Sequence, residues 1–202
     1  MDSYSALKSS IARWIGRSDL TGDVDDAIDL AEARFNRELK HRKMIDIADL
    51  TPTDGVVTLP ADYLDYLQVT EKATRRRDLS YMSIRERDQL YDTAQAGLSD
   101  RFTIINGSLY TYPKAQNNIE LIYRAKIPAL SDVNTTNWIL ADAPDLYLRA
   151  CQLELLSLIN EHNTPRYRTL SMLVSGYIDQ LNEQSQLSEF SGASIRPDMI
   201  TP

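Results

Sequence analysis

The sequence predicts an α+β protein in which N- and C-terminal helix pairs form a helical bundle with an inserted small antiparallel β-sheet region and a flexible C-terminal tail. Apolar residues recur at helical spacing near both ends of the chain, whereas they alternate along its middle. We expect a helical hairpin over residues 1–43, a β-rich insertion over 44–140, a second helix pair over 141–186 and the tail over 187–202.

Two amphipathic helices are predicted in the N-terminal segment. The first ends at Gly16, and the second begins after Gly22-Asp23. The stripe of the first helix consists of Tyr4, Leu7, Ile11 and Trp14, and that of the second of Val24, Ile28, Ala31, Phe35 and Leu39.

Strands and turns are predicted from Met44 onward. The alternating run after Met44 and the run after Asp54-Gly55 indicate a β-hairpin with a longer turn. Pro60 is expected to start a single helical turn, followed by a strand over residues 66–70. The stretch from Lys72 to Asp78 is interpreted as an exposed loop.

The second half of the insertion contains the clearest local signals. Ser83 is a candidate N-cap for a short helix. Asn106-Gly107 between two alternating runs predicts a hairpin with a type I′ turn. The run from Asn118 to Ala125 is expected to complete the sheet.

Two further helices are predicted after the insertion. Asp142 is a candidate cap for a very apolar helix, and Pro144 suits its first turn. Asn163-Thr164-Pro165 separates this helix from the next. Beyond about Ser185 the chain is polar and rich in helix breakers, which indicates a tail that cannot bury enough apolar area to fold alone.

Composition and charge exclude several classes of protein. The net charge of −7 is unfavourable for sequence-independent DNA binding. The single cysteine, Cys151, allows neither an intrachain disulfide nor a Cys-rich zinc site. No signal-peptide pattern and no apolar run of about 20 residues occurs, so we expect no membrane partner and a protein that is cytoplasmic where it is made.

No catalytic constellation is evident, and we expect neither enzyme activity, a cofactor nor a metal. The acidic run beginning at Asp23 lacks the glycine and ligand spacing of a calcium loop. The two histidines, His41 and His162, have no zinc-site spacing, and Cys151 is better interpreted as apolar packing. Acidic pairs such as Asp62 and Asp65 remain open as a general acid and base.

One basic cluster, Arg75-Arg76-Arg77, interrupts this acidic chain. It is interpreted as a solvated loop, as a contact with an acidic protein neighbour or as a contact with DNA phosphates. The acidic balance of the chain favours a protein neighbour over DNA.

Three segments together resemble the phage head-to-tail adaptor proteins of the tail tubular protein A kind. These segments are Ala31–Leu39, Leu59–Leu64 and Ile119–Ser131 running into Pro144–Tyr147. Their order and spacing cover roughly Tyr4 to Leu181.

The resemblance implies a structural virion protein without catalytic residues. Such a protein would assemble under the portal protein as a homo-oligomeric ring, a dodecamer in the virion, and contact a tail or nozzle protein. The ring would extend the channel through which genomic DNA passes without specific binding. Candidate interface residues are Arg75, Arg76, Arg77, Trp138, Ile195, Arg196, Pro197, Met199 and Ile200.

Two alternatives to the adaptor remain open at the level of the sequence. One is another tail-completion or assembly protein, and the other is a small uncharacterised enzyme. An adaptor forms rings, alone or with its portal, whereas an enzyme has a compact pocket with converging polar groups.

Overall fold

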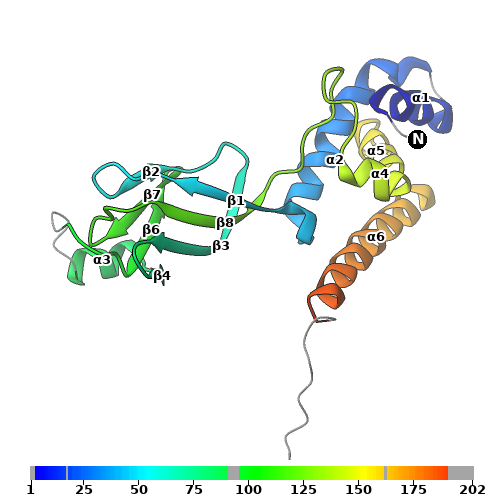
Figure 1. Ribbon diagram of the computed structural model, residues 1–202. Helices are drawn as coiled ribbons and strands as arrows, with labels where there is room; N and C mark the ends of the chain where they lie inside the picture. The colour runs from blue at the N-terminus through cyan, green and yellow to red at the C-terminus, as the bar shows by residue number, and fades with distance from the viewer. Residues whose placement is uncertain (1–2, 17, 91–95, 162, 191–202) are drawn as a thin grey trace, which may run out of the picture. The chain divides into compact units, whose positions relative to one another are not determined.

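The computed structural model describes residues 3–16, 18–90, 96–161 and 163–190. It separates into two compact units, one formed by residues 1–42 with 127–202 and the other by residues 43–126 (Figure 1). The first unit is helical and the second is rich in strands, which confirms the α+β class. Residues 127–140, expected in the β-rich insertion, lie in the helical unit.

The helical unit is built around α5 (Pro144–Leu158), which contacts α1 (Tyr4–Ile15), α2 (Val24–Glu38), α4 (Trp138–Asp142) and α6 (Pro165–Phe190). Eight of its side chains are buried, and this confirms its predicted central place. Pro144 occupies the first turn as predicted. Asp142 does not cap α5 but lies inside the short α4, whose N-cap is Asn137.

The N-terminal helices follow their predicted stripes with one correction. Gly16 ends α1 with φ +69°, and all five stripe residues of α2 are buried. Trp14, however, is 61% exposed, and Ile15 is buried in its place. Each residue turns the helix by about 100°, and the buried face after Ile11 continues at Ile15, four residues on, instead of at Trp14, three residues on. A 3₁₀ helix, η1 (Ser18–Asp23), precedes α2.

The helix α6 extends further than expected. It begins at Pro165, as predicted, and Thr164 Oγ1 accepts a hydrogen bond from the N–H of Tyr167 at 3.2 Å. It continues to Phe190, so residues 187–190 of the expected tail are helical. The remainder of that tail, 191–202, lies outside the described residues.

The β unit contains two four-stranded sheets where a single small sheet was expected. The first has the order β1-β8-β3-β4 and the second the order β2-β7-β6-β5. Their bounds are β1 (Ile45–Leu50), β2 (Val56–Thr58), β3 (Tyr63–Lys72), β4 (Arg76–Asp78), β5 (Ser80–Tyr81), β6 (Arg101–Ile105), β7 (Ser108–Tyr112) and β8 (Ile119–Ala125). Pairing is antiparallel except between β5 and β6.

Local turn chemistry in this unit matches the sequence, whereas several pairings do not. Asn106 and Gly107 have φ of +47° and +72° between β6 and β7, as a type I′ turn requires. Ser83 caps α3 (Ile84–Leu90), and its N–H donates to the Glu86 carboxylate at 2.8 Å. The predicted hairpin of β1 with β2 is wrong, because β1 pairs with β8 and β2 with β7.

Two other local predictions are corrected. The segment at Pro60 forms a turn that runs directly into β3, so no helical turn precedes the strand. The expected loop from Lys72 to Asp78 is a hairpin in which β4 pairs with the end of β3, with Lys72 opposite Arg76. Alternate residues of these strands, among them Val69, Phe102, Leu109 and Leu121, join one core that draws on both sheets.

Candidate interaction surfaces

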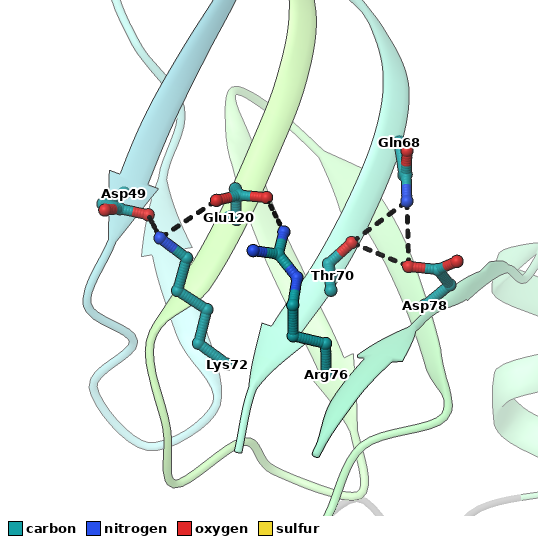
Figure 2. A network of polar contacts seen from close by, with 7 residues as sticks. All are labelled: Asp49, Gln68, Thr70, Lys72, Arg76, Asp78 and Glu120. Carbon is teal, nitrogen blue, oxygen red and sulfur yellow. Dashed lines mark hydrogen bonds and ion pairs between the residues drawn. The ribbon is translucent and has the colours of Figure 1, made fainter. Parts of the chain in front are cut away.

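A network of charged side chains crosses the first sheet from β1 to β4 (Figure 2). Lys72 Nζ lies 2.5 Å from Asp49 Oδ1 and 3.0 Å from Glu120 Oε2. Arg76 on β4 forms an ion pair with the other oxygen of Glu120. The pairings place Asp49 opposite Glu120 and Lys72 opposite Arg76, so two acidic side chains on β1 and β8 lie beside two basic side chains on β3 and β4.

These contacts keep the network in its charged form. The hydrogen bonds from Lys72 to Asp49 and Glu120 raise the pKa of Lys72. The hydrogen bond from Lys72 lowers the pKa of Glu120. Next to this network, donors from Gln68 and Thr70, at 2.9 and 2.8 Å, lower the pKa of Asp78. The short strand β4 is therefore attached by side chains as well as by its backbone pairing.

The predicted basic cluster lies at the tip of this hairpin. Arg75 is in the turn, and Arg76 and Arg77 begin β4. All three are exposed, and they line a hollow of about 400 Å³ together with Ala73, Thr74 and Leu98. Within the described residues, Arg75 and Arg77 form no ion pair, whereas Arg76 is bound by Glu120.

Trp138 lies in the helical unit, at the start of α4. Its ring stacks on the His41 imidazole, with 4.8 Å between ring centroids and 20° between planes. Trp138 is half-buried, so part of its ring remains accessible. The C-terminal candidates Ile195, Arg196, Pro197, Met199 and Ile200 lie outside the described residues.

A buried polar cluster in the helical unit was not identified from the sequence. Glu32 is 5% exposed, and its Oε1 accepts hydrogen bonds from the N–H of Leu130 at 2.9 Å and from the Tyr147 hydroxyl at 2.8 Å. Asn137 donates to the Tyr147 oxygen at 2.7 Å and to the carbonyl of Pro128 at 2.9 Å. Burial raises the pKa of Glu32 and of Tyr147.

The sequence does carry a signal for this cluster. Glu32 is four residues after Ile28 and three before Phe35, so it shares the buried face of α2. A carboxylate at such a position requires hydrogen-bond partners. Those partners come from residues 128–147, and they hold this segment against α2.

The side chains considered for catalysis make other contacts. Burial raises the pKa of the Cys151 thiol, and Cys151 is completely buried, as its interpretation as packing predicts. Asp62 accepts from the Tyr123 hydroxyl at 3.1 Å, and Asp65 pairs with Arg124 at 2.9 Å. Among the described residues, no cluster of His, Cys, Asp and Glu is arranged to hold a metal ion.

Apolar side chains are exposed on the first sheet next to the charged network, since Ile45, Ile47 and Asp49 are alternate residues of β1. Ile47 is 61% exposed and Ile45 is 41% exposed, and Ile47 pairs with the half-buried Ile122 of β8. No helix in the described part of the chain is long and apolar enough to span a bilayer.

Comparison with known proteins gives one result. A family model described as SU10 adaptor protein matches residues 2–196. No curated protein matches the chain. The match extends over both structural units, so it applies to the helices and to the two sheets together.

Proposed function

The chain belongs to the SU10 adaptor protein family, a family of structural phage proteins, and on that premise we propose that it is the head-to-tail adaptor of a virion. It assembles as a ring under the portal protein, links the capsid to a tail or nozzle protein, and lies at the head-tail junction. The ring is a dodecamer that matches the portal, and it extends the DNA channel. The observation that carries this proposal is the family match over residues 2–196.

The surfaces of both units support a role in assembly. The isoleucines of β1, the Trp138 ring and the exposed arginines at the β3–β4 tip are surfaces that a neighbouring protein can cover. Aromatic and Arg side chains are enriched at protein interfaces. Arg75, Arg76, Arg77 and Trp138 therefore stay our candidate contacts.

The charge of the chain suits a channel through which DNA slides. A net charge of −7 disfavours phosphate binding, because like charges repel at short range. A ring of such subunits lets DNA pass without specific binding. The adaptor needs no cofactor for this role.

Electron microscopy of the purified chain mixed with the portal protein of its virion tests the proposal. We expect rings of the chain on one face of the portal, with the portal's rotational symmetry. The chain alone serves as the control for self-assembly. A portal that carries no added density at micromolar concentrations of the chain contradicts the proposal.

The C-terminal segment provides a second test. Residues 191–202 are polar and contain two prolines, and we propose that they contact the portal or a neighbouring subunit through Ile195–Pro197 and Met199–Ile200. Deleting Ser191–Pro202 should weaken portal binding, measured by co-sedimentation. Undiminished binding of the truncated chain rules out this contact while leaving the ring proposal intact.

A further inference from the structure

The tip of the β3–β4 hairpin combines free positive charge with an exposed apolar side chain. We define the basic tip as Ala73–Arg77 together with Leu98, the residues that line the hollow of about 400 Å³. Leu98 is 53% exposed, although it is a large aliphatic residue. A hollow with cationic walls and an aliphatic side chain is suited to a ligand with both carboxylate and apolar groups.

The three arginines of the basic tip differ in what they bind. Arg76 lies opposite Lys72 and pairs with Glu120 on the face shown in Figure 2. Arg77 lies opposite Glu71, one residue along, so its side chain leaves the other face of the sheet. Arg76 thus attaches the hairpin to β8. Arg75 and Arg77 form no ion pair among the described residues, so their side chains remain available to a ligand.

Several cations of the β unit are paired within it, whereas Arg75 and Arg77, like Arg85, Arg101 and Lys126, form no ion pair among the described residues. Lys72, Lys114 and Arg124 each contact a carboxylate of the same unit at 3.0 Å or less. Because the chain has more acidic than basic residues, carboxylates that could pair with its lysines and arginines are plentiful. Arg75 and Arg77 form no ion pair within the part of the chain that the structure describes, and they are therefore a surface open to an external anion.

The backbone that carries these arginines is held in place before any ligand binds. Glu71, opposite Arg77, is completely buried and accepts from the N–H of Ser99 at 2.8 Å and from Asn117 at 3.0 Å. This ties β3 to the segment that carries Leu98. A preorganised site loses less conformational entropy on binding than a flexible loop does.

We propose that the basic tip binds an acidic peptide segment of a neighbouring virion protein, with carboxylates on Arg75 and Arg77 and an aliphatic side chain against Leu98. The inference rests on the proposed function in taking the neighbour to be a virion protein. A protein segment is favoured over DNA for two reasons. A phosphate backbone offers nothing apolar to Leu98, and the net charge of −7 repels a duplex.

Fluorescence anisotropy with the full chain tests this site. The probe is a labelled 12-residue peptide of alternating acidic residues and leucine, compared with a peptide in which Gln replaces each acid and one in which Ser replaces each leucine. A labelled 20-bp duplex is the nucleic-acid probe. We expect binding of the acidic leucine peptide that weakens with added salt, and weaker binding of the other three probes.

Variants locate the binding on the chain. R75E/R77E should weaken binding of the acidic leucine peptide by about tenfold or more, since two charge-assisted contacts become repulsive. The matched control R37E/R168E makes the same change in net charge at exposed helical positions and should bind as the wild type does. L98S should weaken binding of the leucine peptide about threefold and leave binding of the serine peptide unchanged.

Each contrary result overturns the inference. The first such result is that the wild type does not bind the acidic leucine peptide. The second is that R75E/R77E and R37E/R168E lose the same amount of affinity for this peptide. The third is that the duplex binds more tightly than the peptide and that its binding depends on Arg75 and Arg77. Ring formation on the portal is scored separately with the wild-type chain. A missing ring contradicts the proposed function, and a missing peptide interaction contradicts only the role of the basic tip.

Discussion

Glu32 shows how one side chain can make the stability of the helical unit depend on pH. It is buried on α2 and has two hydrogen-bond donors, the N–H of Leu130 and the hydroxyl of Tyr147. No basic side chain in the described structure forms an ion pair with it. Burial without a counter-charge disfavours the carboxylate and raises the pKa of Glu32 above its ordinary value of 4.5.

The sign of the effect follows from proton binding. Between pH 4.5 and the higher folded-state pKa, the folded chain holds a proton on Glu32 that the unfolded chain has lost. The contribution of Glu32 to the free energy of unfolding therefore decreases as pH rises through this window. The steepest possible slope is about 1.4 kcal/mol per pH unit for one group.

Urea unfolding at a series of pH values from 4.5 upward tests this prediction. The free energy of unfolding of the wild type minus that of E32Q should fall as pH rises, because only the wild type titrates at this position. E183Q replaces an exposed glutamate on α6 and is the control for the loss of a surface carboxylate. A constant difference for E32Q contradicts the proposed titration.

Residue patterns predicted which faces of the helices are buried but not how polar groups are satisfied. The stripe of α2 from Val24 to Leu39 is buried as predicted. Tyr147, which donates to Glu32, and Asn137, which donates to Tyr147, are more than 100 residues away from Glu32 along the chain. No local periodicity records such a contact, and only the fold brings the three side chains together.

At the level of helices, two glycines of the helical unit should respond to the same substitution with opposite signs. Gly16 ends α1 with φ +69°, and Gly176 lies within α6. Both are exposed, and an added Cβ would meet no atom within 4 Å at either position. Any difference between the two substitutions is therefore due to the backbone and not to packing.

G16A should lower the free energy of unfolding by about 1 kcal/mol, because alanine disfavours the left-handed conformation. G176A should raise it by about 0.5–1 kcal/mol, because alanine favours the helix more than glycine does. Thermal unfolding followed by helical circular dichroism measures both. Shifts of the same sign in the two variants contradict this explanation.

Strands were easier to predict than their partners. The turn at Asn106-Gly107 fixes the pairing of β6 with β7, because two residues determine the register of a hairpin. β1 pairs instead with β8, so that Ile45 lies opposite Arg124, far along the chain. Alternation in β1 is compatible with either partner, and for this reason the adjacent run at Val56 was mistaken for the second strand of its hairpin.

At the basic tip, too, the sequence predicts the local feature but not the contacts that the sheet order creates. Three consecutive arginines predict exposure, and all three are exposed. Which of them is neutralised depends on Glu120, which reaches the hairpin only because β8 lies next to β3. The sequence therefore identified the cluster, and the sheet order distinguishes Arg76 from its two neighbours.

On the scale of the whole molecule, the β unit has the topology of a domain inserted into the helical unit. The chain enters it at Lys43 and leaves it at Lys126. Ile45 and Arg124 are paired residues on adjacent strands, so the two crossings lie next to each other. An insertion whose ends are adjacent can be removed or expressed alone without displacing the ends of the host.

We therefore predict that residues 43–126 fold in isolation, because both sheets and the core between them lie within this range. The complementary chain, with a flexible linker of about six residues joining Arg42 to Ile127, should also fold, since such a linker easily spans adjacent strands. Cooperative thermal unfolding and dispersed amide resonances in each fragment are the expected results. A fragment over residues 44–140 should be no more stable than the 43–126 fragment, because residues 127–140 belong to the helical unit. If the 43–126 fragment is unfolded and the 44–140 fragment is folded, the domain boundary lies at residue 140 and our prediction is wrong.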